Sequence, residues 1–195
     1  MAIEHKDISE ADLHEVKGAS TAQAGQILIA DGAGNTSFKH NLTNSHGEML
    51  IAGYTTALAL TAAVDPTLAT DSDYVKITGA SMWAAGHLDR VTFNVDELVV
   101  PDAGGYQVTF WASLDSSAAG ALIGVKYAIN DTTPYSTRKI LTSSKSIGDV
   151  ENIFGAGIVE PLAANDTISL YIASDTITNV VVKEAGLLIS LLDPA

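Results

Sequence analysis

The segment from Val91 to Ser113 constrains the fold of this chain more than any other stretch. Apolar side chains occupy alternate positions on either side of residues 101–105: Val91, Phe93 and Val95 before, and Tyr106, Val108 and Phe110 after. A period of two is typical of strands that bury one face. Pro101 cannot donate a ladder hydrogen bond, and Gly104 and Gly105 accept backbone angles that other residues resist. We therefore expect two strands separated by a turn.

Short apolar runs of the same kind recur through the rest of the chain, with no helical segment between them. The clearest are 49–54, 74–77, 122–129, 140–141, 153–159, 167–173 and 183–192, and polar loops are expected at 65–73 and 143–152. A hydrophobic content of 47% is enough for a core, and only 17% of residues are charged. About eight strands joined by short connections predict an all-β sandwich or jelly roll.

The N-terminal part has a different composition. Residues 1–24 are polar and are expected to form an extended arm, with a short helix over 9–16 as the alternative. Residues 25–40 predict a hairpin around the Gly-rich tip 31–35. A lone hairpin is marginally stable in water, so it should pack on copies of itself, on the main domain or on a larger particle. A polar linker at 41–47 then divides the chain into an arm with hairpin, 1–46, and a head domain, 47–195.

The charge and the absence of cysteine exclude several classes of partner and chemistry. Ten basic residues against 23 acidic ones give a formal net charge of −13, whereas nucleic acids and anionic membranes require clustered Lys and Arg. We therefore expect neither partner. With no cysteine there is no disulfide and no thiol chemistry, which fits synthesis in a reducing cytoplasm. The first residues lack the apolar core of a signal peptide, so we expect any export to follow another route.

No catalytic constellation stands out. His5, His14, His40 and His46 fall in the arm and linker, where no scaffold would hold them for catalysis, and His87 stands apart. Phosphate-binding, nucleophile-elbow and zinc-protease motifs are absent from the sequence. We expect no enzyme and no cofactor.

Two groups of carboxylates leave a calcium site open as an alternative. Asp65, Asp71 and Asp73 lie close together in sequence, as do Asp149 and Glu151. Neither group has the glycine and terminal glutamate of a regular calcium loop, so solvated acidic loops are the favoured interpretation.

The few aromatic residues are expected in the core and at subunit contacts. Phe110 and Trp111 are adjacent on one predicted strand, so one must face inward and the other outward. We place Phe110 in the core and Trp111 at a subunit contact or partly exposed. Sugar stacking by Trp83, Trp111 or Tyr135 is the alternative.

The region from about Leu60 to Leu192 resembles the jelly-roll domains of the C1q and tumour-necrosis-factor superfamily. Four stretches carry the resemblance: Val100–Phe110, Gly124–Asn130, Leu162–Leu170 and Ala185–Leu192. Asn165 replaces a glycine of the family pattern, and asparagine tolerates left-handed backbone better than most residues. The resemblance implies a C1q/TNF-like jelly roll and a homotrimer, with Tyr106, Phe110, Trp111 and Tyr171 as interface or core residues.

The stretch 16–35 resembles the attachment segments that precede trimeric domains in bacteriophage fibres and capsid-decorating proteins. This resemblance implies a structural virion protein, made in the host cytoplasm, that acts as a capsid-decoration or head-fibre protein. The major capsid protein or another virion component would then be its partner, contacted through Ile27, Leu28, Ile29 and Phe38. The alternative is a tail-fibre or receptor-binding tip that recognises host cell-surface carbohydrate.

Overall fold

The structure is a computed structural model that describes residues 26–30, 36–40, 45–52, 56–79, 81–131, 140–143, 146–148 and 150–194. The chain divides into two compact units, Met1–Leu42 and Thr43–Ala195. None of the described helices is long and apolar enough to cross a membrane.

The first unit contains the predicted hairpin. Strand β1 (Gln26–Ala30) pairs antiparallel with β2 (Thr36–His40), and Ala30 lies opposite Thr36. This pairing confirms the hairpin expected at 25–40. Leu28 is 41% exposed. The arm, the alternative helix at 9–16, the tip 31–35, and the side chains of Ile27, Ile29 and Phe38 lie outside the described residues.

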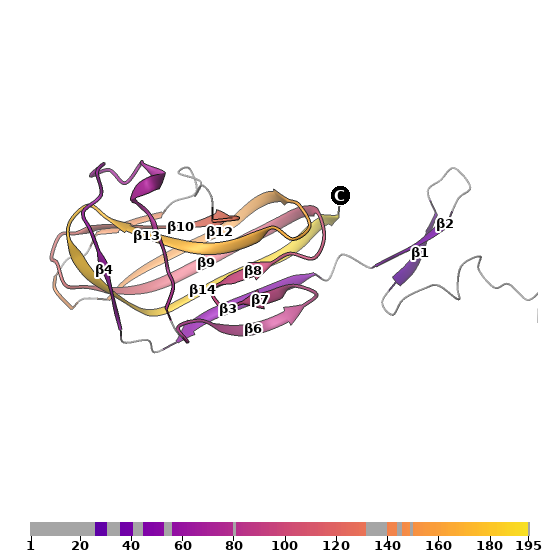
Figure 1. The fold of residues 1–195 in the computed structure, drawn as a ribbon, viewed down its shortest axis with the longest axis horizontal. Helices are drawn as coiled ribbons and strands as arrows, with labels where there is room; N and C mark the ends of the chain where they lie inside the picture. Colours follow the sequence, from indigo (N-terminus) through magenta and orange to yellow (C-terminus); the bar gives the residue numbers. More distant parts are fainter. Residues whose placement is uncertain are drawn as a thin grey trace, which may run out of the picture. The chain divides into compact units, whose positions relative to one another are not determined.

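The second unit is a sandwich of two antiparallel sheets (Figure 1). One sheet, which we call the β14 sheet, has the order β12–β9–β14–β3–β6, and β4 also pairs with β14. Its strands are β3 (His46–Ala52), β4 (Ala57–Leu60), β6 (Ala84–Asp89), β9 (Gly104–Ser116), β12 (Val150–Leu162) and β14 (Thr178–Pro194).

The other sheet, the β13 sheet, has the order β11–β10–β13–β8–β7, with β5 also paired to β13. Its strands are β5 (Val75–Lys76), β7 (Thr92–Asn94), β8 (Glu97–Val99), β10 (Leu122–Ile129), β11 (Ile140–Ser143) and β13 (Thr167–Ser174). The described helical structure consists of one 3-10 turn, η4 (Asp71–Asp73).

The core lies between the two sheets and follows from the alternation along β9. Buried and half-buried residues alternate along the whole strand, with Tyr106, Val108 and Phe110 fully buried. The Phe110 ring meets the edge of the Tyr127 ring on β10, with centroids 6.1 Å apart. The Tyr127 hydroxyl donates to the buried Glu160 carboxylate on β12, so a hydrogen bond also joins the two sheets.

The expectation for residues 91–100 was partly wrong. The run forms two short strands, β7 and β8, closed by a two-residue turn at Val95 and Asp96. Residues 101–103 then carry the chain from β8 in one sheet to β9 in the other. The sequence pattern did not reveal this turn, because Val95 continues the apolar alternation. Its φ of 57° is a turn conformation that β-branched residues rarely adopt.

Two predicted loops are shorter than expected. The linker expected at 41–47 gives way to strand β3 at His46, and the preceding Ser45 is buried and accepts a hydrogen bond from the Leu191 amide at 2.8 Å. The loop expected at 143–152 ends at Val150, where β12 begins. In both places polar residues occupy strands because a neighbouring strand supplies backbone hydrogen bonds.

Residues 61–74 form a strap over the outward face of the β13 sheet. Leu68 and Tyr74 from the strap cluster with Ala128, Tyr171 and Ala173 of the sheet. The strap is joined to the edge of this sheet by the Ala63 amide, which donates to the Ser174 carbonyl at 2.8 Å. The strap explains why six consecutive residues of β10 are buried, where one covered face would give alternation.

The carboxylates of the strap hold its own backbone. Asp73 accepts hydrogen bonds from the amides of Val64 and Asp65, and Asp65 accepts from the amides of Thr67 and Ala69. Within the described ranges, no three His, Asp or Glu side chains are placed to hold a metal ion as they stand. The calcium alternative stays untested for both groups, because the Asp71 side chain and Asp149 lie outside the description.

Replacing Val95 with asparagine should raise the free energy of unfolding by about 1 kcal/mol, because asparagine adopts left-handed backbone at lower cost than a β-branched residue. Val95 is 65% exposed, so little packing is lost. Chemical denaturation measures the change. The matched control is Val64→Asn, since Val64 is 91% exposed and has no positive φ. An equal gain in both variants would show that backbone strain at Val95 is not the cause.

Candidate functional site

The outward face of the β14 sheet carries a row of apolar residues that crosses four strands. Phe154 on β12 lies opposite Trp111 on β9, Trp111 lies opposite Gly186 on β14, and Gly186 lies opposite Leu50 on β3. Phe154 is 65% exposed, while Trp111 and Leu50 are half-buried. An exposed aromatic row at the centre of a sheet is an unusual surface for a soluble monomer.

Trp111 lies flat against the sheet because Gly186 leaves room for its ring. A Cβ atom at position 186 would come within 2.0 Å of Trp111 Cζ2, so only glycine allows this indole to lie across β14. The ring therefore extends the row smoothly from β9 onto β14. Flat, rigid aromatic surfaces of this kind are enriched at protein interfaces.

On the described residues of β9 and β14, the centre of this face carries no charge. Next to the aromatic row, Thr109 pairs with Leu188, and beyond it Val159, Gln107 and Ser190 form a further row. Asp115 and Glu184 lie toward one end of the sheet, and Glu48 on β3 lies directly opposite Leu188. We call the uncharged centre the outer face, and define it as Leu50, Gln107, Thr109, Trp111, Phe154, Val159, Gly186, Leu188 and Ser190.

Of the residues predicted as interface or core, the structure brings only Trp111 to the outer face. Tyr106 and Phe110 are fully buried in the sandwich core, and the Tyr106 hydroxyl donates to the Asp102 carbonyl at 3.0 Å. Tyr171 is buried under the strap on the opposite side of the molecule. Phe154, Leu188 and Leu50 were not predicted for this face, although the strand pairing aligns them with Trp111 or beside it.

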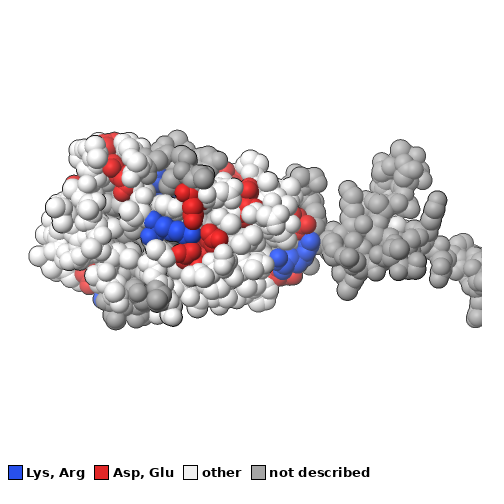
Figure 2. Space-filling model, in the orientation of Figure 1, with Lys and Arg blue, Asp and Glu red and all other residues white. Residues whose placement is uncertain are grey.

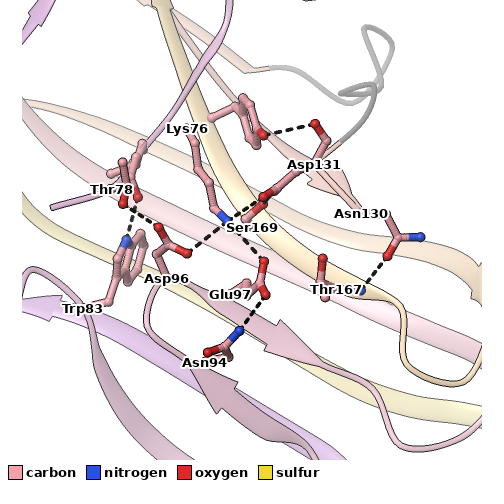
Figure 3. Close-up of polar contacts among 12 residues, drawn as sticks. Lys76, Thr78, Trp83, Asn94, Asp96, Glu97, Asn130, Asp131, Thr167 and Ser169 are labelled. Carbon is pink, nitrogen blue, oxygen red and sulfur yellow. Dashed lines mark hydrogen bonds and ion pairs between the residues drawn. The ribbon is translucent and has the colours of Figure 1, made fainter.

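A second group of polar residues gathers around Lys76 on the β13 sheet (Figure 3). The Lys76 Nζ lies 3.0 Å from Asp96, 3.1 Å from Glu97 and 2.8 Å from Asp131. These carboxylates come from the β7–β8 hairpin and from the turn after β10. On the face drawn in Figure 2, the basic atoms likewise lie against acidic ones.

Each carboxylate around Lys76 is also held by a neutral donor. The Thr78 hydroxyl donates to Asp96 at 2.5 Å, the Asn94 amide donates to Glu97 at 2.9 Å, and the Ser169 hydroxyl donates to Asp131 at 2.6 Å. Lys76 thereby joins β5, the β7–β8 hairpin and the turn after β10. The sequence did not predict this cluster, because its four charged residues meet only through the sheet pairing.

The protonation states of Lys76 and Asp131 indicate that this cluster has a structural role. Burial acts to lower the pKa of Lys76, but hydrogen bonds to Asp131, Asp96 and Glu97 outweigh it and raise the pKa above its usual range. Burial likewise acts to raise the pKa of Asp131, but hydrogen bonds from Lys76 and Ser169 outweigh it and lower the pKa. A protonated ammonium is no nucleophile, and an ionised carboxylate bound to it is a poor base. The cluster therefore supplies stability and offers no evident catalytic chemistry.

Trp83 does not fit the alternative of sugar stacking. Its ring is buried, and its indole N–H donates to the Ile77 carbonyl at 2.7 Å. Tyr135 lies outside the described residues. Of the three aromatic residues considered for that role, only Trp111 has a partly exposed ring in the described structure.

Sequence comparison gives no family for this chain. No protein-family model matches it, and no curated protein sequence matches it.

Solved structures do share its fold. Eiger TNF from S. frugiperda is 14% identical with a TM-score of 0.51, and the match covers 77% of this chain and 95% of that one. The globular domain of zebrafish complement 1qA protein is 12% identical with a TM-score of 0.49, covering 77% and 99%. Murine APRIL at pH 8.0 is 14% identical with a TM-score of 0.46, covering 75% and 99%. The likeness to Eiger and the two antiparallel sheets show that this chain has a C1q/TNF-like jelly-roll fold.

Proposed function

We propose that the chain is a non-enzymatic structural protein that assembles as a homotrimer through the outer face of its β14 sheet. The observation that carries this proposal is the uncharged row formed by the exposed Phe154 and the half-buried Trp111 and Leu50, in a chain with a net charge of −13. Three acidic copies repel one another, so they can meet only where charge is absent and apolar burial outweighs the repulsion. The resemblance of the sequence to trimeric jelly-roll domains supports three copies rather than two.

We further propose that the assembly belongs to a bacteriophage virion, as a capsid-decoration or head-fibre protein. Support comes from the resemblance of residues 16–35 to phage attachment segments and from the hairpin β1–β2, which is too small to be stable alone. In this proposal residues 1–46 bind the major capsid protein or another virion component, with Ile27, Leu28, Ile29 and Phe38 as contacts. The jelly roll is displayed outward.

The tail-fibre alternative, in which the head recognises a glycan, has less support. Glycan sites use exposed aromatic rings beside polar groups. The described turns at the Ser116 end of the sandwich, 117–121, 146–148 and 175–177, contain no aromatic residue. Their most exposed large side chains are the aliphatic Ile147 and Ile177.

Light scattering should give the mass of a trimer for the wild-type full chain and the mass of a monomer for the Phe154→Glu variant. A carboxylate at position 154 would place three charges in the buried interface, where desolvation is costly. Val64→Glu is the matched control, because Val64 is more exposed than Phe154 and lies on the strap, away from the outer face. A monomeric wild type, or an unchanged trimer in Phe154→Glu, would contradict assembly through this face.

Binding to purified capsids that lack the protein tests the virion assignment separately. The full chain should bind, whereas a chain starting at Thr43 should remain trimeric and fail to bind. Thr43 is chosen because Ser45 is already buried in the jelly roll and must be kept. A trimer indifferent to capsids would leave assembly intact and overturn the decoration role.

A further inference from the structure

The histidines on β3 and β6 are brought together at the open edge of the β14 sheet. The rings of His46 and His87 are nearly parallel, with an interplanar angle of 6° and centroids 4.6 Å apart. The nearest ring nitrogens, His46 Nε2 and His87 Nδ1, are 2.5 Å apart. Strand β6 is the last strand on this side of the sheet, so the pair is accessible from solution.

The β3–β6 pairing brings the two histidines together next to a bulge. Gly47 lies opposite Leu88 and Met49 lies opposite Ala85, so two residues of β6 face the single residue Glu48. Asp89 lies directly opposite His46, and His87 is two residues from Asp89 on the same strand, so His87 stands on the same face of the sheet as His46. Bulges are common beside functional sites.

Carboxylates surround the pair on both strands. Glu48 lies two residues beyond His46, and its Oε2 accepts from the His87 amide at 3.5 Å. Asp89 lies two residues beyond His87, directly opposite His46 in the strand pairing. The nearby cation Arg90 is occupied elsewhere, since it lies 2.7 Å from Asp102 and donates to Ser45. The local field therefore favours a bound cation.

We propose that His46 and His87 form a binding site for a transition-metal ion of the Zn²⁺, Cu²⁺ or Ni²⁺ class. Two imidazole nitrogens this close can share one proton between them, and a metal ion can take that proton's place. Imidazole suits these three metals, whereas Ca²⁺ and Mg²⁺ require oxygen ligands. With metal–nitrogen bonds of about 2.0–2.1 Å, the two nitrogens would stand about 2.9–3.3 Å apart, so they must separate by less than about 1 Å, and the rings must turn until both nitrogen lone pairs point at the ion.

The site supplies two imidazole ligands, and water can fill the remaining coordination positions of the metal ion. No third His, Asp or Glu of the described chain is already placed to complete it. Binding should therefore be weaker than in a four-ligand structural zinc site, and the fold should not depend on it. Both ligands come from one chain, so the inference does not rest on trimer formation.

Calorimetric titration of the metal-free full chain with Zn²⁺ at pH 7.5 tests the site. We expect one ion per chain, with an affinity about tenfold or more lower in His46→Gln and in His87→Gln. Binding should weaken on acidification to pH 5.5, because imidazole binds metal only when deprotonated. Cu²⁺ should give an electron paramagnetic resonance spectrum with two nitrogen ligands that falls to at most one in either variant.

Three controls separate this site from other sources of binding. The variant His5→Gln/His14→Gln/His40→Gln removes the histidines of the N-terminal unit and should bind as the wild type does, and so should Phe154→Glu. Circular dichroism should show that His46→Gln and His87→Gln keep the fold. Loss of binding in the triple variant or in Phe154→Glu, or unchanged binding in both single variants, would overturn the proposal.

Discussion

Phe110→Ala should lower the free energy of unfolding by about 3–5 kcal/mol, the usual cost of removing a fully buried phenylalanine. The Phe110 ring has no exposed surface, meets the Tyr127 ring across the core and lies against Gly155 of the neighbouring strand. The cavity left by the ring would lie between the two sheets. Urea denaturation should show the loss at every protein concentration, because the contact lies within one chain.

Phe154→Ala is the matched control, since it removes the same side chain from the next strand on the opposite face. The Phe154→Ala substitution should change stability only at concentrations at which the wild type is assembled. The free energy of unfolding of the wild type should rise with protein concentration, whereas that of Phe154→Ala should not. At concentrations low enough for monomers, Phe154→Ala should unfold within about 0.5 kcal/mol of the wild type. An equal, concentration-independent loss in both variants would mean that Phe154 contributes to the core.

Lys76→Met should cost roughly 2–3 kcal/mol at pH 7, between the values for an exposed and a buried ion pair. The variant leaves three carboxylates facing one another, and only 18% of the Lys76 side chain is exposed to solvent. The pKa of Asp131 is lowered in the folded protein, so its contribution to stability is present above its unfolded pKa and is lost as pH falls through its folded pKa.

The difference between wild type and Lys76→Met should therefore shrink as pH falls below about 4, where protonation relieves the repulsion. Thermal unfolding from pH 7 to pH 3 measures this convergence. Lys183→Met is the control, because Lys183 is 40% exposed and lies 3.4 Å from a single carboxylate, Asp115. It should cost at most about 0.5 kcal/mol at any pH. A cost for Lys76→Met that is independent of pH would indicate lost packing rather than unpaired charge.

The sandwich could be predicted because its long strands carry their own pattern. Alternation along residues 106–110 matches the buried positions of β9, and the hairpin signal at 25–40 matches β1 and β2. The turn at Val95 could not be predicted from local sequence. Its unfavourable backbone conformation is offset by hydrogen bonds and ion pairs that Asp96 and Glu97 make with residues far away in sequence. Local preference was overruled there by long-range contacts.

The candidate surfaces were harder to predict than the strands. Trp111 was expected at a contact from its position beside Phe110, but its alignment with Phe154 and Leu50 depends on the register of four strands. His46 was assigned to a linker, yet it stacks on His87, 41 positions away, because β3 pairs with β6. One signal was available: both His46-Gly47-Glu48 and His87-Leu88-Asp89 place a histidine and a carboxylate on the same face of a strand.

The position of β14 also bears on how the chain acquires its structure. This strand, the last one described, lies at the centre of its sheet and pairs with β3, β4 and β9. In a chain emerging from the ribosome, β3 can pair with β6, and β9 with β12, before β14 is made, but these two pairs cannot be joined until residues 178–194 have been synthesised. Until then β3 and β9 each keep an unpaired edge, and apolar edges of that kind are where nascent β proteins aggregate. The β14 sheet can therefore be completed only after residues 178–194 have been synthesised.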